Sequence, residues 1–434
     1  MHLKINKTAL SFFIIFIILG IMLIVHYINM GVQNVLFGFG LILTFGILSI
    51  CLSIQKWKDF INPVSLYFIF IFGFAFSQLN LSTLVKSFNI VSIAILVLSI
   101  CSYLIGTFIN IRFKSPFKFI YFNTKTSLIL FYLIIIFSVF SFIIEVLQIG
   151  YLPILRIFSF DIYNDSNKKL VSFIHYFIML FAIYPAWSFI LLKGKIISKT
   201  FYIALLIFSF FILLNYLSRQ MIMLYMLSSL ISYSFYNKIS IKKLLFYTFF
   251  IISFFFIIGQ IRISQMDTIK KVSGYTAAKF LHNAAGMKYE SNTIESTFIL
   301  YSSIRYNSFN EFVKKANNED YMSYGRFVFR PIISLFFLDR LGLINYSPEY
   351  SLTSNISTYA IDSYLDFGFL GVILFGLFYG LSAKHFYSKF KSRDKKYIIP
   401  WTIIIFCLIM CPFMNYFDSF FVFLVWSVNK LIIS

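Results

Sequence analysis

Charged side chains are scarce in this sequence. Only 12% of its 434 residues carry a charge and 60% are hydrophobic, whereas roughly a quarter of an average soluble domain is charged. A surface that faces water cannot be built from this composition. The scarcity therefore excludes an ordinary soluble enzyme or binding domain and favours a protein that is surrounded by lipid.

Cysteines and the common catalytic motifs are also scarce or missing. The sequence has no DxD pair, no HExxH or CxxC motif, no Walker loop and no GxSxG elbow. These absences argue against a metal-dependent nucleotide-sugar transferase, a zinc protease, an ATP-driven pump and a serine hydrolase. We therefore expect no metal and no cofactor. The four cysteines all lie in apolar runs, where they are typical packing residues rather than disulfide partners: Cys51, Cys101, Cys407 and Cys411.

Long hydrophobic runs are abundant, and each is close to the ~20 residues that a helix needs to cross a bilayer. They predict an all-α, polytopic bundle of about twelve spans in a single membrane domain, 1–434. The first run follows Lys4 and Lys7 but lacks a cleavage site, so we interpret it as a retained span rather than a signal peptide. The predicted spans are 9–28, 33–55, 60–83, 88–110, 127–148, 171–192, 201–217, 221–237, 244–261, 367–383, 397–417 and 419–433.

The distribution of basic residues sets the predicted topology. With both termini in the cytoplasm, the inner loops hold 21 of the 37 basic residues but only two of the 16 acidic ones, Asp59 and Asp394. This satisfies the positive-inside rule, so the net charge of +21 does not call for a nucleic-acid partner. The exterior then has a small loop, 150–170, and a large segment, 262–366, in which we expect short helices on the membrane surface. The Phe-, Ile-, Lys- and Asn-rich composition favours a bacterial plasma membrane.

Arg219 is the only charge between residues 201 and 237. One helix over this stretch would be about 55 Å long, which is too long for a bilayer. The sequence therefore predicts two short helices that turn at Arg219 on the exterior side. An arginine between apolar segments costs about 2.5 to 3.5 kcal/mol near a helix centre, so it is a candidate functional residue. The alternative is an interfacial anchor.

Further arginines in the large exterior segment are candidates for phosphate binding. Arg326 and Arg330 are four residues apart and would share a face of a helix, although Pro331 favours an extended backbone there. Guanidinium groups suit phosphate oxygens, which indicates a diphosphate-bearing ligand. The alternative is a solvated face that binds anionic lipid headgroups. Ten tyrosines of this segment are expected in the interfacial aromatic belt or on platforms for sugar rings.

Acidic residues near the end of this segment are candidates for the proton acceptor. Asp362 and Asp366 lead directly into the span that begins at 367, so both are predicted near the exterior surface. Asp366 could instead cap the following helix. His282 is expected to be structural, and Glu145 is expected to reach water from the outer end of its span.

Two stretches carry a resemblance to a known family. They are NYLSRQM around Arg219, and NISTYAIDSYLDFGFLGVILFGLFYG over 355–380. Together with about twelve spans and one late, dominant exterior loop, they make the chain resemble the O-antigen polymerase, or oligosaccharide repeat-unit polymerase, family of bacterial envelope glycan synthesis.

The resemblance implies a metal-independent glycosyltransfer on the outer face. The growing glycan on undecaprenyl diphosphate would move to the non-reducing end of a new lipid-linked repeat unit, for an O-antigen or a capsule. It implies diphosphate contacts from exterior arginines and a proton acceptor such as Asp366 or Asp362, with a flippase and a chain-length regulator as partners. The arginines are Arg219, Arg326, Arg330, Arg305 and Arg262.

Three other functions share parts of this pattern. An O-antigen ligase, which moves the finished glycan to the lipid A core, has the same arrangement of spans with one large exterior loop. A flippase or transporter for lipid-linked units usually has short loops, so the 105-residue exterior segment argues against it. A membrane scaffold would not need charges inside apolar stretches.

Overall fold

The described part of the chain is helical. The computed structural model describes residues 35–79, 81–83, 88–109, 124–156, 172–264, 282–289, 293–319, 321–329, 332–333 and 358–433. Helices make up 81% of the structure, and the described residues form no strand, only an isolated bridge between Ser82 and Met287. The predicted all-α class is confirmed. The first predicted span, 9–28, lies outside the described residues.

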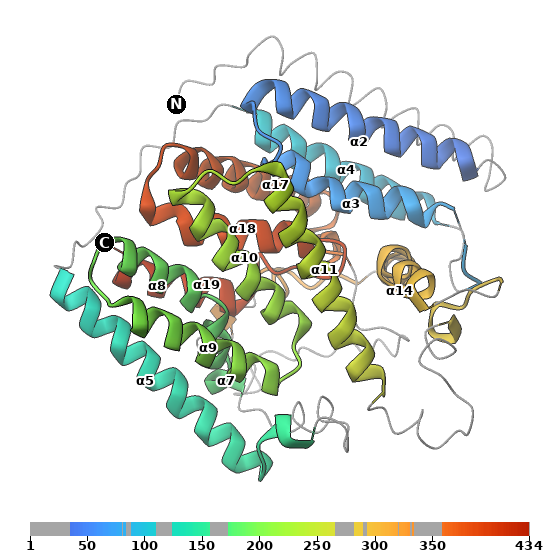
Figure 1. Cartoon of the computed structure of the whole chain (residues 1–434). Coiled ribbons are helices and arrows are strands. Elements are labelled where there is room, and N and C mark those ends of the chain that lie inside the picture. The colour runs from blue at the N-terminus through green and yellow to red at the C-terminus, as the bar shows by residue number, and fades with distance from the viewer. Residues whose placement is uncertain are drawn as a thin grey trace. The chain divides into compact units, whose positions relative to one another are not determined.

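Every other predicted span contains a helix (Figure 1). Within the described chain, five helices are long and apolar enough to cross a membrane. The total of twelve spans remains a prediction. The five are α2 (Val35–Trp57), α4 (Ile90–Phe108), α5 (Thr124–Ile149), α11 (Ile241–Ser264) and α17 (Ala360–Lys391). The shorter apolar helices are α3 (Pro63–Ser77), α9 (Lys199–Asn215) and α19 (Phe420–Ile432), and α18 (Ile398–Met410) precedes α19 in the chain.

The predicted span 171–192 is broken. It consists of α7 (Ser172–Met179), a 3-10 turn (Leu180–Ala182) and α8 (Tyr184–Lys193), and the two apolar halves bend by 54°. Pro185 explains the break, because proline fits the first turn of a helix but cannot continue the helix before it. If this bent pair is one span, the described chain has six candidate spans.

The chain divides into two compact units. The first contains α2, α3, α4, most of α17, and the helices α14 (Thr293–Ser302) and α15 (Ile304–Asn318). The second contains α5, α7, α8, α9, α11 and α10 (Arg219–Tyr236). Helices α14 and α15 lie in the segment 262–366, in which short helices were predicted. Their orientation on a membrane surface remains a prediction.

In the first unit, α4 and α17 cross at small residues. Gly376 and Gly380 lie on α17 in a GxxxG arrangement, opposite Ser102 and Gly106 of α4. A Cβ on Gly380 would collide with the carbonyl oxygen of Tyr103. Small residues of this kind let helix backbones approach closely in lipid, where packing rather than the hydrophobic effect drives association.

Buried tyrosines form much of the core of the first unit. The hydroxyls of Tyr67 and Tyr359 lie 2.7 Å apart, and Tyr306 donates to the carbonyl of Phe70 at 2.6 Å. Tyr306 and Tyr359 belong to the ten tyrosines expected in an aromatic belt or on sugar platforms, and for these two the expectation is wrong. Their hydroxyls have internal partners, which removes most of the cost of burying them.

Helix α17 reverses near its start. Phe367 and Gly368 have non-helical backbone angles, and the φ of Gly368 is 60°. Residues 360–366 fold back along the rest of the helix, since the rings of Tyr359 and Tyr379 lie 6.0 Å apart and Gly371 abuts the carbonyl of Ser363. The longer helical piece therefore begins beside position 367, where the span was predicted to start.

In the second unit, α9 and α10 form a helical hairpin. Helix α9 ends at Asn215 and α10 begins at Arg219, with Leu217 at a φ of 46° in the turn. The Tyr225 hydroxyl donates to the carbonyl of Leu206 at 2.9 Å, as expected for two antiparallel helices. The predicted division of 201–237 into two helices that turn at Arg219 is confirmed.

Candidate functional site

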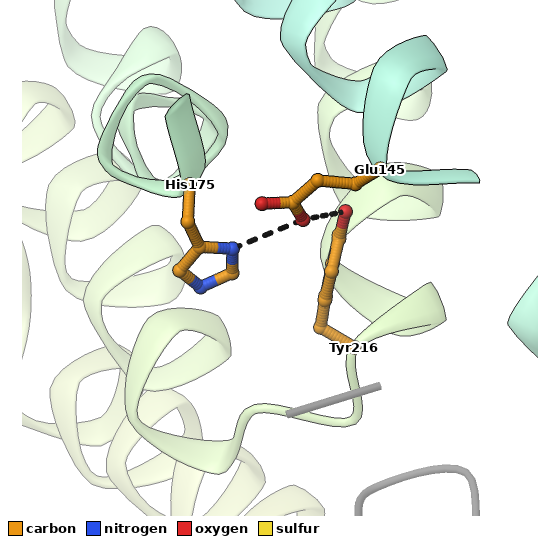
Figure 2. A network of polar contacts seen from close by, with 3 residues as sticks. All are labelled: Glu145, His175 and Tyr216. Atoms are coloured by element: carbon orange, nitrogen blue, oxygen red, sulfur yellow. Dashed lines mark hydrogen bonds and ion pairs between the residues drawn. The ribbon is translucent and has the colours of Figure 1, made fainter. Parts of the chain in front are cut away.

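A carboxylate, an imidazole and a phenol meet in the second unit (Figure 2). Glu145 comes from the last turns of α5, His175 from the first turns of α7, and Tyr216 from the residue that ends α9. The Tyr216 hydroxyl donates to Oε2 of Glu145 at 2.7 Å, and Nδ1 of His175 lies 3.2 Å from the same oxygen. One carboxylate oxygen therefore holds both partners.

The environment of Glu145 differs from its prediction. Its side chain is fully buried, so it does not reach water from the end of its span. A carboxylate in an apolar interior needs hydrogen-bond donors because burial removes its hydration, and α7 and the end of α9 supply them. The second oxygen, Oε1, has no hydrogen-bond partner among the described residues. Glu145 is thus held in place with one acceptor atom still available.

The contact with Glu145 orients the imidazole of His175. If Glu145 is ionised it can only accept, so Nδ1 of His175 is then the donor and Nε2 is the nitrogen without a proton in the neutral ring. The His175 side chain is 23% exposed, while that of Glu145 has no exposed area. A carboxylate that fixes the tautomer of a partly exposed imidazole is an arrangement suited to general-base catalysis.

Arg219 begins α10, three residues after Tyr216. It is half-buried, and its guanidinium lies against Gly259 of α11. A Cβ added to Gly259 would come within 2.9 Å of Nη1 of Arg219. A cation at a helix N-terminus opposes the helix dipole, so this position does not stabilise α10. The guanidinium and the first amide N–H groups of α10 instead give this end of the hairpin a positive potential that suits an anion.

In the first unit, Asp366 fixes a turn. Its buried carboxylate accepts hydrogen bonds from the backbone N–H groups of Phe327, at 3.1 Å, and Val328, at 2.7 Å, and from the hydroxyl of Ser323. Both oxygens are thus occupied by donors of residues 323–329. This geometry makes Asp366 a positioning residue for the turn, and it does not cap the helix that follows.

The turn fixed by Asp366 carries Arg326. Tyr324 and Gly325 have φ angles of 51° and 92°, and Arg326 is exposed. Residues 324–329 form turns rather than a regular helix. Arg330 lies outside the described residues, so the helical face predicted for Arg326 and Arg330 is not tested.

The other predicted arginines lie in separate elements. Arg305 is half-buried in the first turn of α15, in the first unit. Arg262 belongs to the last turn of α11, and its side chain lies outside the described residues. The structure therefore joins Asp366 to the turn that carries Arg326, while Arg219 belongs to the other unit.

Asp362 has an acidic neighbour that the sequence did not single out. Asp418 follows α18, and its carboxylate accepts hydrogen bonds from the Tyr379 hydroxyl at 2.8 Å and from the amide of Asn415. Burial, and then the nearby charge of Asp362, raise the pKa of Asp418 well above its usual range. Asp362 is half-buried, so it remains a candidate proton acceptor.

Sequence patterns alone did not identify His175, Tyr216 or Asp418. A usable signal was present only for the first two, because Glu145 in an apolar run requires donors from neighbouring helices. Within the described parts of the chain, no group of three or more His, Cys, Asp or Glu side chains is arranged to hold a metal ion. Comparisons of the chain with protein families, with curated proteins and with solved structures found no match.

Proposed function

We propose that the chain is a glycosyltransferase that polymerises oligosaccharide repeat units carried on undecaprenyl diphosphate, at the outer face of a bacterial plasma membrane. The observation that carries this proposal is the turn between α9 and α10. Its Tyr216 shares the Glu145 carboxylate with His175, and its Arg219 supplies a fixed cation three residues further on. A proton acceptor and an anion site thus belong to one unit.

In the proposed reaction, a hydroxyl of the incoming repeat unit attacks the anomeric carbon of the growing glycan. Its proton passes to Nε2 of His175 as the new C–O bond forms, and Glu145 stabilises the resulting imidazolium. General-base catalysis of this kind contributes about 10²- to 10⁴-fold in rate. The imidazolium then returns its proton to water.

The bond between the anomeric carbon and the diphosphate oxygen breaks in the same step. Negative charge builds up on the departing lipid diphosphate, and Arg219 lowers the free energy of that charge in the transition state. A single donor of this kind is typically worth about 10² to 10³ in rate. Because the guanidinium is held against Gly259, little reorganisation is needed when the charge develops.

The predicted residues of the first unit have a secondary place in the proposal. Arg326, on the turn that Asp366 fixes, and Arg305, in α15, keep their phosphate-binding role as predictions. So do Arg330 and Arg262. Asp362 is the alternative proton acceptor. The proposed cellular partners are a flippase that delivers the units and a chain-length regulator.

A deletion strain distinguishes a polymerase from a ligase and from a flippase. Loss of a polymerase leaves the acceptor core with one repeat unit, loss of a ligase leaves none, and loss of a flippase traps the units inside. A gel of surface glycan distinguishes the three patterns. We expect single-unit glycan in the deletion strain and in a strain carrying Arg219→Ala, and long chains when Lys199→Ala, which alters the opposite end of the hairpin, is supplied. Normal chain lengths with Arg219→Ala would refute the diphosphate role.

A further inference from the structure

An aromatic groove runs along the hairpin of the second unit. It has a volume of about 260 Å³ and is bounded by α8, α9, α10 and α11. Helices α10 and α11 contact each other, and Figure 1 shows them side by side. Among the described residues, no charged side chain lines the groove. Most of its lining consists of aromatic rings: Phe189, Tyr202, Tyr225, Tyr233, Tyr247 and Phe250.

The lining of this α10 groove determines what it can hold. A sugar or a phosphate would need charged or convergent polar groups, and the groove offers phenol rings with apolar side chains. Its volume is also below the ~300 to 1,000 Å³ of typical small-molecule pockets. An apolar chain of small cross-section is the occupant that fits both the lining and the size.

The same two helices hold a cation beyond one end of the groove. Arg219 starts α10, and its guanidinium lies against Gly259 of α11. Tyr225 and Tyr233 follow Arg219 by six and fourteen residues, or about 9 and 21 Å along a helix. A ligand with a charged head and an apolar tail would place the head at Arg219 and the tail in the groove.

This distance selects the kind of tail. Half of the hydrocarbon core of a bilayer is ~15 Å thick, so a tail that starts at Arg219 near the membrane surface must pass the midplane to fill the groove. The acyl chains of a phospholipid in that leaflet end near the midplane, whereas a polyprenyl chain is longer. A phospholipid also has two chains, whereas a polyprenyl phosphate has one.

We propose that the α10 groove binds the chain of a polyprenyl phosphate whose phosphate lies at Arg219. The inference rests on the proposed function for the nature of the headgroup, and it adds the binding site of the lipid carrier. It predicts that affinity depends on chain length, because each isoprene unit inside the groove buries apolar surface.

Two serines on α10 provide a matched pair of variants. Ser229 lines the groove and donates to the carbonyl of Tyr225 at 3.0 Å. Ser234 donates to the carbonyl of Ile231 at 2.8 Å and does not line the groove. Ser229→Trp fills the groove, and Ser234→Trp adds the same ring to the same helix elsewhere.

The experiment measures binding of sugar-free undecaprenyl phosphate to the purified full chain in detergent, beside a phosphate with only two isoprene units. We expect the wild type and Ser234→Trp to bind the long chain at least roughly tenfold more tightly than the short one, and Ser229→Trp to lose that preference. A diazirine placed in the long chain should label residues of α10 and α11 in wild type and not in Ser229→Trp.

Equal affinity for the two chain lengths in wild type would overturn the inference. So would equal behaviour of the two tryptophan variants, or full competition by a phospholipid. Thermal melting of each variant in detergent identifies misfolding, and the wild-type comparison of chain lengths needs no variant. A chain that binds the long phosphate selectively but transfers no sugar would refute the proposed function alone.

Discussion

At the residue scale, three charged side chains are positioned in three different ways. Glu145 has a phenol and an imidazole as partners, Asp366 accepts from backbone N–H groups, and Arg219 lies half-buried against Gly259. Only Glu145 has a side chain beside it, the imidazole of His175, that can accept a proton. The position of Arg219 between apolar segments was readable from the sequence, whereas the partners of Glu145 depend on helices that are distant in the chain.

His175 is expected to carry the proton transfer. Its replacement by alanine should lower kcat by about 10²- to 10⁴-fold, because alanine lacks the nitrogen that accepts the hydroxyl proton in the proposed reaction. Turnover of lipid-linked units by the purified chain measures this change in kcat.

Glu145→Gln is the companion variant of His175→Ala. It keeps the shape of the side chain but removes the charge that stabilises the imidazolium, so we expect a smaller loss of kcat. His282→Ala, at an exposed hydrogen-bonded position of the first unit, is the control and should be neutral. A wild-type rate in His175→Ala would assign the proton to Asp362 instead.

Asp366 is expected to act through the turn that carries Arg326. In Asp366→Asn one carboxylate oxygen becomes an NH₂ group, which cannot accept from the backbone of Phe327 or Val328. An unsatisfied buried donor costs about 1 to 3 kcal/mol. Hydrogen exchange at 323–329 should therefore become faster in this variant and stay unchanged in Asp362→Asn.

The alternative for Asp366 is a direct catalytic role. If Asp366→Asn abolished turnover while exchange at 323–329 stayed at the wild-type rate, Asp366 would be the proton acceptor that the sequence first suggested.

At the element scale, two helical turns set the positions of the functional residues. The turn between α9 and α10 was predictable because one charge divides a stretch that is too long for a bilayer. The reversal of α17 at Phe367 and Gly368 was not, because an Asp-Phe-Gly sequence is equally compatible with a helix start. It places Asp362 beside Asp418 and Tyr379, which no local pattern indicates.

The crossing of α4 and α17 should tolerate no added methyl group at its centre. Gly380→Ala would force a Cβ against the carbonyl of Tyr103, and overpacking of this kind costs about 1 to 3 kcal/mol. Gly40→Ala is the control, because no atom lies within 4 Å of its Cβ and alanine favours a helix by about 0.5 to 1 kcal/mol. Thermal melting in detergent should show a lower midpoint for Gly380→Ala and no decrease for Gly40→Ala. An unchanged midpoint for Gly380→Ala would contradict the close crossing.

At the scale of the whole molecule, composition and charge predicted a helical membrane protein. They did not predict which side chains meet in its interior. The apolar runs predicted the described helices, and the basic clusters predicted a consistent topology, because both depend on the bilayer rather than on side-chain partners. The internal positions of Tyr306 and Tyr359 depend on contacts between distant helices. For that reason, the sequence alone led us to expect both tyrosines in the interfacial aromatic belt or on platforms for sugar rings.

The predicted topology has a direct check. In a chain without its native cysteines, Ser218→Cys at the α9–α10 turn should react with a membrane-impermeant maleimide added outside intact cells. Ser392→Cys, near the end of α17, should react only after the membrane is opened. Labelling in the reverse order would place Arg219 in the cytoplasm and exclude its proposed substrate.

The central claim is that Arg219 and the network of Glu145, His175 and Tyr216 transfer glycan from a lipid diphosphate. The most direct measurement supplies the purified, reconstituted chain with undecaprenyl-diphosphate-linked repeat units and follows release of undecaprenyl diphosphate together with glycan length. We predict equal amounts of released carrier and new glycosidic bonds, with both falling about 10²- to 10³-fold in Arg219→Ala. Polymer formed at the wild-type rate by that variant, or carrier released without glycan growth, would contradict the account.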